Sequence, residues 1–371
     1  MQKRRLAMYN DNRLKIGLFG ANCSSGRAVT RVPERWLGSW EECLALAGIA
    51  DDAGIDFMLP ISRWKGYGGD TDYQGATLET ITWATGVLAK TRRITVFGTV
   101  HTPLFHPVIA AKQFVTADHV GSGRFGLNIV CGWNEDEFEM FGVTLREHDT
   151  RYAYAQEWLD AIERMWFGED DFDFNGEFIK LKKVRAKPKT YAGTRPLIMN
   201  AAVSPAGQAF AVRNCDALFT SPSGTEGMEG YASAVKNVQR LARERGREIG
   251  VYTVGVVCCK PTRSEAQEYY RYAYIEHADW SAVDSIIEIR LKRPASSVPE
   301  AELAIMRQTL VNGLGGLPII GDPDFVAHEM AKLSATGISG IGLSLVNYAR
   351  ELPYFCDEVL PRLGRLGLRA A

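Results

Sequence analysis

Short runs of apolar and β-branched residues alternate along the chain with longer segments whose apolar residues recur at helical spacing. The short runs predict eight strands, at residues 15–20, 56–60, 93–99, 125–130, 196–201, 216–221, 251–258 and 340–345. The longer segments predict helices at residues 40–53, 77–90, 108–119, 151–166, 205–213, 228–245, 263–278 and 324–335. Strands that alternate with helices are typical of βαβ units in a parallel sheet. Eight strands alternating with helices predict an α/β protein with a closed (β/α)8 TIM barrel.

Two segments do not follow this alternation. Residues 167–192 are acidic and aromatic at first and basic afterwards, which predicts a hairpin insertion. Residues 279–317 combine a helical stretch with a proline- and serine-rich turn and a glycine-rich end, and we expect a lid there, with a solvated linker as the alternative. With these insertions, residues 1–371 fit one barrel domain. An open doubly wound sheet is the alternative fold, but no G-x-G-x-x-G follows the first predicted strand.

The composition narrows the classes of partner and compartment. Lys and Arg number 43 against 44 Asp and Glu, so the formal charge of -1 gives no general attraction to nucleic acid or to an anionic membrane. The 7 cysteines are odd in number and lack any CxxC or zinc-ligand spacing. No segment reaches the roughly 18 uninterrupted apolar residues of a membrane span. We therefore expect a cytoplasmic protein without nucleic-acid or membrane partners.

The most informative motif is GRFGLNIVCGW at residues 123–133, which continues into an acidic segment and then into EHDTRY at residues 147–152. Its middle is predicted to be a buried parallel strand that ends in polar and aromatic residues. The carboxyl ends of such strands carry the ligand sites of parallel α/β folds. Asn128 is the strongest candidate for a ligand contact, because an amide within an apolar strand needs buried hydrogen-bond partners.

These motifs resemble the bacterial-luciferase-like superfamily of flavin-dependent monooxygenases. The likeness runs in motif detail from about residue 15 to about residue 224, and more loosely to residue 360. Within the superfamily the chain is most similar to the pyrimidine monooxygenase and dimethylsulfone monooxygenase branches. The resemblance implies a luciferase-like TIM barrel that binds reduced FMN and dioxygen at its mouth.

The resemblance also implies roles for individual residues. Those that match the small pocket where dioxygen meets the flavin, and are expected to be catalytic, are Leu59, Thr99, Asn128 and Trp133. Those that match cofactor-binding positions are Ser62, Arg63, Asn128, Glu137, Arg151, Tyr152 and Ser204, with Arg151, Tyr152 and Ser204 at the phosphate. An apolar wall with one hydroxyl and one amide suits this chemistry, because it excludes water and can hydrogen-bond a developing oxyanion.

Several of these residues also have an ordinary structural explanation. Leu59 could be core, and Thr99 could satisfy a backbone group. Ser204 precedes a proline and could simply cap a helix. Arg151 and Tyr152 could lie together on a solvent-exposed helix face.

The remaining titratable residues do not single out an acid or a base. His101, His106 and His148 all lie near predicted strand ends or loops, and nothing in the sequence selects one of them. No HxxxH or HExxH spacing predicts a metal site. No G-x-S-x-G or P-loop motif occurs either, so we expect a cofactor to carry the difficult chemical step.

By resemblance, the expected function is that of a two-component FMNH2-dependent monooxygenase, supplied by a separate NAD(P)H-dependent flavin reductase. It would insert one oxygen atom of O2 into a small organic substrate through a flavin peroxide. A cyclic amide or nitrogen heterocycle is the expected substrate, and a sulfone or sulfonate is the alternative. Ser62 and Arg63 stand where the pyrimidine branch has an apolar residue and a lysine, which leaves the substrate open.

Other readings of the same family likeness stay open. A deazaflavin-dependent reductase and a non-catalytic flavin-binding protein would share the barrel. The family also implies a homodimer or homotetramer, for which the apolar helix at residues 77–88 could supply a face. A helix buried in the core of a single chain would show the same apolar pattern.

Overall fold

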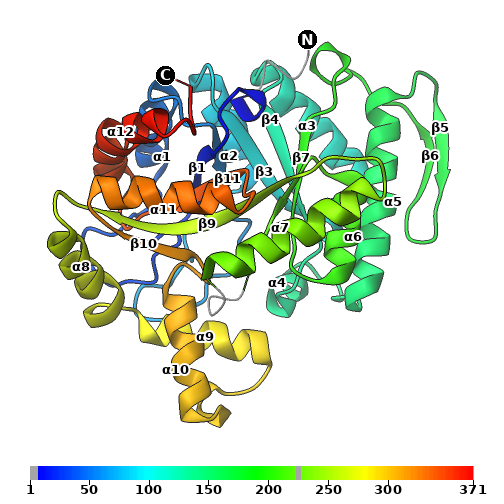
Figure 1. Ribbon diagram of the computed structural model, residues 1–371. Helices are drawn as coiled ribbons and strands as arrows, with labels where there is room; N and C mark the ends of the chain where they lie inside the picture. The colour runs from blue at the N-terminus through cyan, green and yellow to red at the C-terminus, as the bar shows by residue number, and fades with distance from the viewer. Residues whose placement is uncertain (1–6, 223–226, 371) are drawn as a thin grey trace.

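Eight parallel strands form a closed barrel in the computed structural model, which describes residues 7–222 and 227–370 (Figure 1). The barrel strands are β1 (Lys15–Phe19), β2 (Phe57–Leu59), β3 (Thr95–His101), β4 (Phe125–Val130), β7 (Leu197–Ala201), β8 (Ala217–Phe219), β9 (Gly250–Cys259) and β11 (Gly340–Ser344). Each pairs in parallel with the next in this order, and β11 pairs with β1 to close the ring. The predicted TIM barrel is confirmed, and the eight predicted strands overlap those of the barrel.

A further strand, β10 (Leu317–Gly321), was not predicted from the sequence. Tyr252 of β9 pairs with both β8 and β11, and Val256 pairs with both β10 and β11. Strands β8 and β10 therefore share one edge of the long strand β9. The sequence pattern missed β10 because it is short, contains Pro318 and follows a glycine-rich turn.

The segment 279–317 is mostly helical rather than irregular. It contains α9 (Trp280–Leu291), the short helix η6 (Ala295–Ser297) and α10 (Glu300–Val311). In Figure 1 these helices form the projection at the bottom of the view. Residues 167–192 contain β5 (Phe172–Asn175) and β6 (Lys180–Val184), an antiparallel pair beside α5 at the right edge of Figure 1.

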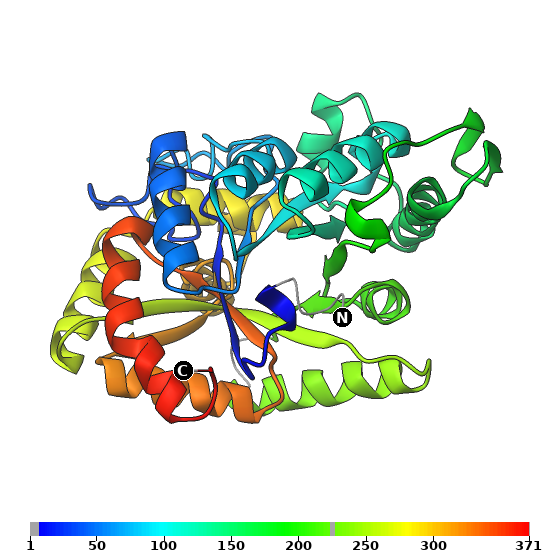
Figure 2. The same cartoon turned by 90° about the horizontal axis from the view of Figure 1, so that it is seen from above.

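Helices surround the barrel, and Figure 2 shows α1 in blue beside α12 in red on one flank. The remaining helices are α1 (Trp40–Asp52), α2 (Thr80–Lys90), α3 (Pro107–Val120), α4 (Glu135–Met140), α5 (His148–Phe167), α6 (Pro205–Asn214), α7 (Gly227–Arg243), α8 (Arg263–Arg271), α11 (Pro323–Ala335) and α12 (Tyr348–Arg365). Four short helical turns are η2 (Ala7–Tyr9), η3 (Thr102–Leu104), η4 (Tyr191–Gly193) and the π-helical η5 (Tyr272–Glu276). Helix α12 was not predicted; it contains two prolines, which interrupt a helical sequence pattern.

The possible helix cap at Ser204 is formed in the structure, and Ser39 caps a second helix. Ser39 caps α1 in a capping box with Glu42, and Ser204 caps α6 by accepting a hydrogen bond from Gly207 N–H. Each such cap contributes about 1 kcal/mol to helix stability. The helix start at Ser204 matters most here, because it directs the first turn of α6 toward the carboxyl ends of the barrel strands.

The barrel interior is filled by aromatic rings that lie against glycines of the neighbouring strands. Three such register pairs are Gly17 with Phe57, Gly126 with Phe97, and Gly340 with Tyr252. A Cβ at Gly17 would lie 2.3 Å from the Phe57 ring, and overpacking of this kind costs about 1–3 kcal/mol. The rings of Phe57 and Phe97 meet edge to face at 6.2 Å, and those of Phe57 and Tyr252 at 5.8 Å. This packing closes the barrel below the site.

The apolar face of α2 is buried within the chain itself. Ile81, Trp83, Val87 and Leu88 are each at most 3% exposed and belong to the core between the barrel and its helices. The helix at residues 77–88 is thus a core helix, the alternative that its pattern allowed. The expected homodimer or homotetramer stays a prediction that this face does not support.

Candidate active site

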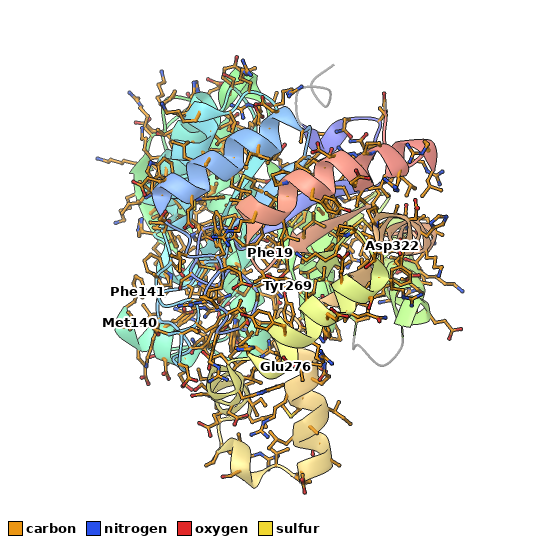
Figure 3. All side chains as sticks on the ribbon, turned by 90° about the vertical axis from the view of Figure 1, so that its left-hand side faces the viewer. Phe19, Met140, Phe141, Tyr269, Glu276 and Asp322 are labelled. Atoms are coloured by element: carbon orange, nitrogen blue, oxygen red, sulfur yellow. The ribbon has the colours of Figure 1, made fainter. Side chains whose placement is uncertain are left out.

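A cavity of about 400 Å³ opens at the carboxyl ends of the barrel strands. Its walls come from residues at or after the ends of β1, β2, β3, β4 and β7 and from the first turns of α5 and α6. The insertion after β9 adds Arg290 of α9 and Leu314. Figure 3 shows Phe19, a wall residue at the end of β1, near the centre of the view, whereas Met140 and Phe141 at the end of α4 lie at its edge. Exposed wall residues, among them Trp133 and Arg290, mark the entrance.

Thr99 and Asn128 form a polar pair in the cavity wall. They are register partners on β3 and β4, and Asn128 Nδ2 donates to Thr99 Oγ1 at 3.2 Å. Thr99 Oγ1 in turn donates to the Pro60 carbonyl at 2.7 Å. Asn128 Oδ1 is buried and has no hydrogen-bond partner among the described residues. Leaving a buried acceptor unsatisfied costs free energy, so this oxygen is suited to accept a hydrogen bond from a ligand.

The other two residues predicted to be catalytic lie in different environments. Trp133 lines the entrance of the cavity and is 38% exposed. Leu59 does not line the cavity; it is 1% exposed and packs with Phe57 and Phe97 inside the barrel. The structure therefore brings Thr99, Asn128 and Trp133 to one cavity and leaves Leu59 in the core. Its neighbour in sequence, Pro60, occupies the wall instead.

Ser62 and Arg63, which follow β2, both line the cavity, but Glu137 lies behind them. The Glu137 carboxylate is 1% exposed and forms an ion pair with Arg63 at 2.9 Å. It also accepts hydrogen bonds from Trp64 N–H at 2.7 Å and Lys65 N–H at 3.3 Å. Glu137 thus holds the loop after β2 and the Arg63 guanidinium in place, and does not itself line the cavity. Arg63 Nε has no hydrogen-bond partner among the described residues, so the guanidinium keeps donor capacity for a ligand.

Arg151, Tyr152 and Ser204 meet at the opposite end of the cavity. Arg151 Nη1 donates to the Gly132 carbonyl, while its buried Nε has no partner in the described chain. The Tyr152 hydroxyl hydrogen-bonds with Ser204, which caps α6. A Cβ at Gly207 would lie 2.4 Å from that hydroxyl, so the glycine keeps the space beside it open. A guanidinium, a phenol and a helix N-terminus together form a suitable site for an anion.

The structure distinguishes the three candidate histidines. His101 ends β3 and lines the cavity, and burial together with the charge of Arg63 lowers its pKa to about 3, so its ring is neutral. His148 lines the exposed entrance, where its ring contacts Tyr152 at 5.3 Å. His106 instead caps α3 away from the cavity by accepting from Val108 N–H.

Four further wall residues with side-chain N–H or O–H groups were not selected from the sequence: Arg27, Tyr67, Gln74 and Arg290. Arg27 follows β1 and Tyr67 follows β2, so their positions after strand ends were a usable signal. Arg290 lies on α9, more than 30 residues past the end of β9, and only the return of the insertion to the barrel mouth brings it here. No sequence signal marked it.

Buried polar atoms without partners gather on this cavity. Among the described residues they include Arg27 Nε, Arg63 Nε, Tyr67 OH, Gln74 Oε1, His101 Nδ1, Asn128 Oδ1 and Arg151 Nε. Because buried polar groups are normally hydrogen-bonded, such a concentration is typical of a binding site. Hydrogen-bond donors dominate at both ends of the cavity. These unpartnered polar atoms fit an anionic ligand that also has a flat polar ring.

Comparison with known proteins shows the family of the chain. A family model described as luciferase-like monooxygenase matches residues 14–340. The chain belongs to this family. The family expected from the sequence motifs is therefore confirmed, and with it the class of enzyme. The cavity of this luciferase-like monooxygenase occupies the carboxyl ends of the strands, as expected for a barrel enzyme.

Two relatives of this luciferase-like monooxygenase match over nearly their whole length. The FMNH(2)-dependent dimethylsulfone monooxygenase of Pseudomonas putida is 28% identical over 359 residues, which are 95% of this chain and 96% of the relative. The pyrimidine monooxygenase RutA of Yersinia enterocolitica is 27% identical over 351 residues, 94% of this chain and 95% of the relative.

Solved structures share the fold. Riboflavin lyase (RcaE), crystallised with modified FMN and riboflavin, has a TM-score of 0.85 at 21% identity and covers 96% of this chain and 93% of its own. The long-chain alkane monooxygenase LadA has a TM-score of 0.85 at 19% identity, with coverage of 98% and 94%. At these identities the likeness concerns the arrangement of the barrel and its insertions.

Within residues 7–222 and 227–370, no helix of this luciferase-like monooxygenase is long and apolar enough to cross a membrane. The same residues contain no group of three or more His, Cys, Asp or Glu side chains that could hold a metal ion. All 7 cysteines are free thiols. Cys131 lines the cavity, and burial raises its pKa to about 12, so it is a neutral thiol there.

Proposed function

We propose that this protein is an FMN-dependent monooxygenase of the two-component type. It takes reduced FMN from a separate NAD(P)H-dependent flavin reductase and transfers one oxygen atom of O2 to a small organic substrate. Family membership and full-length relatives named as FMNH(2)-dependent dimethylsulfone monooxygenase and pyrimidine monooxygenase RutA support this function. The observation that carries it is the anion site at one end of the cavity, formed by Arg151, Tyr152, Ser204 and the first turn of α6.

This anion site would hold the phosphate of FMN. Arg151 offers its unpartnered Nε, Tyr152 its hydroxyl, and the N-terminus of α6 the positive end of its helix dipole. Gly207 keeps the space beside Tyr152 clear of a side chain. Reduced FMN would supply the electrons that activate dioxygen, which no amino-acid side chain can supply.

Residues between the two ends would contact the polar ring and control its surroundings. Asn128 would accept a hydrogen bond through its unpartnered Oδ1, while Thr99 fixes the orientation of the amide. Phe19 and Leu314 contribute apolar wall that excludes water. His101 is neutral and buried, so it can hydrogen-bond a ligand without adding charge.

For the substrate we propose a cyclic amide or a related nitrogen heterocycle, with a sulfone or sulfonate as the second candidate. The first choice rests on the likeness to the pyrimidine branch, and the second on the similar identity to the dimethylsulfone enzyme. Incubation with a flavin reductase, FMN and 18O2 separates the two, with uracil, dimethylsulfone and an alkanesulfonate as the first panel. Mass spectrometry should find one labelled oxygen atom in the product. The protein without a reductase should not oxidise NADH.

The cofactor proposal is tested by comparing FMN with riboflavin, which lacks the phosphate. Arg151→Gln should raise the Kd for FMN about ten- to hundredfold, because charge-assisted hydrogen bonds to a phosphate are lost, and should hardly change the Kd for riboflavin. Arg164→Gln is the matched control, since Arg164 lies on the same helix but stacks on Phe172 outside the cavity. Flavin fluorescence quenching gives both constants. Equal affinity of the wild-type protein for FMN and riboflavin would refute the phosphate site.

A further inference from the structure

Three arginines converge on the end of the cavity opposite the phosphate site. Arg27 follows β1, Arg63 follows β2, and Arg290 reaches the wall from α9. The Arg63 guanidinium lies 4.4 Å from the centroid of the Tyr67 ring and 5.5 Å from that of Trp133, and Arg290 lies 5.9 Å from Trp133. Three segments far apart in the sequence thus place positive charge around two aromatic rings, which stack on each other at 6.3 Å.

Tyr67 contacts Arg63 and feels the charges of Arg27 and Arg290 as well. It is 3% exposed, and its hydroxyl has no hydrogen-bond partner among the described residues. Burial raises the pKa of Tyr67, while the charges of Arg63, Arg290 and Arg27 oppose that rise. All three guanidinium groups are therefore within electrostatic reach of one buried donor.

The positive charge at this end exceeds the negative charge near it. No Asp or Glu lines the cavity among the described residues, and the single carboxylate in contact with the cluster is Glu137, which pairs with Arg63. Arg27 pairs with no carboxylate of the described residues; its Nη2 donates to the Gly313 carbonyl, and its guanidinium stacks on Phe19 at 4.3 Å. Three arginines less one glutamate leave two positive charges. At this end of the cavity, a reduced flavin ring, which carries one negative charge, would offset only one of these two charges.

The cluster also keeps unused donors. Arg27 Nε and Arg63 Nε are buried without partners in the described chain, as is the Tyr67 hydroxyl. Buried cations with free donors are costly unless a ligand supplies negative charge and acceptors. The cluster is separate from the phosphate site, because Arg27 and Arg63 follow neighbouring strands β1 and β2, whereas that site follows β4 and β7.

We propose that the substrate of this enzyme carries one negative charge, on a carboxylate or sulfonate-type oxyanion, and that Arg27, Arg63 and Arg290 bind it together with the Tyr67 hydroxyl. Planar oxyanions match the fork of donors that a guanidinium presents. The proposal rests on the proposed function, in that FMN occupies the rest of the cavity, with its phosphate at the other end. It narrows the substrate to an acidic derivative of the proposed classes.

The test compares matched anionic and neutral probes with the protein loaded with reduced FMN in the absence of oxygen. The pairs are methanesulfonate with dimethylsulfone, and uracil-6-carboxylate with uracil-6-carboxamide, so each oxyanion source has its own neutral isostere. Isothermal titration calorimetry at constant ionic strength gives the dissociation constants. Arg290→Gln removes one charge of the cluster, and Arg293→Gln, an exposed arginine of the same insertion that does not line the cavity, is the matched control.

At least one anion should bind the wild-type protein about tenfold or more tightly than its neutral partner, because hydrogen bonds to charged groups are the stronger ones. Arg290→Gln should reduce that preference by about tenfold, and Arg293→Gln should leave it unchanged. Equal affinity within both pairs, no anion binding, or an equal effect of both variants would overturn the proposal. Titration with FMN distinguishes failure of this inference from failure of the proposed function. A protein that binds FMN but not the anions refutes only this inference, whereas one that binds no FMN refutes the proposed function.

Discussion

His101 should make the folded protein sensitive to mild acid. Burial and the charge of Arg63 lower its pKa from the ordinary 6.5 to about 3. Between these two values the unfolded chain takes up a proton at this residue and the folded chain does not. The unfolded state therefore binds more protons, so stability falls as the pH falls from about 6.5 toward 3. At pH 5 the loss from this one residue is about 2 kcal/mol, relative to pH 8.

The assay is the free energy of unfolding in urea, followed by tryptophan fluorescence at pH 8, 7, 6 and 5. His101→Gln removes the titrating group. Between pH 8 and pH 5 the wild-type protein should therefore lose about 2 kcal/mol more of its free energy of unfolding than this variant does. His328→Gln, which removes an exposed surface histidine, is the matched control. Parallel pH curves for the wild-type protein and His101→Gln would show that the histidine is not buried as a neutral ring.

Two further substitutions probe the supports of the site. Glu137→Gln leaves Arg63 as a buried cation without its counter-charge and should lower the stability by about 3–5 kcal/mol, whereas Asp136→Asn, in an exposed pair with Lys65, should cost about 0–1 kcal/mol. Thermal unfolding measures both, and equal losses would contradict the role given to Glu137. Gly207→Ala places a Cβ 2.4 Å from the Tyr152 hydroxyl, so the Kd for FMN should rise about tenfold, given overpacking costs of about 1–3 kcal/mol. Gly364→Ala, which meets nothing within 4 Å, is the control in fluorescence titrations, and an unchanged Kd in Gly207→Ala would count against the phosphate site.

The site was partly visible in the sequence because barrel geometry sends the carboxyl ends of all strands to one mouth. Thr99 and Asn128 could be placed together for this reason, and the structure makes them register partners. The same reasoning failed for Leu59. Its side chain lies on the same face of the strand as that of Phe57 and packs inside the barrel, whereas the next residue, Pro60, lines the cavity. A shift of one residue along the strand therefore decides between core and cavity.

Glu137 shows a different limit. An acidic segment after a strand end predicts a position near the mouth, but not whether the carboxylate faces a ligand or a neighbouring loop. Contact with the backbone of residues 64 and 65, more than 70 positions away, decides that it faces the loop. Long-range contacts of this kind leave no local pattern in the sequence.

The sequence by itself determined the eight-strand barrel, most of its helices, the end of the barrel that carries the site and the family. These follow from local properties: the period of the apolar residues, the caps, and motifs read along one segment. The tertiary structure alone decided which side chains share the cavity, that Glu137 holds Arg63, and that Arg290 returns to the mouth beside Trp133. Those facts depend on how distant segments pack and on which charges are buried together, and neither is a property of any one stretch of chain.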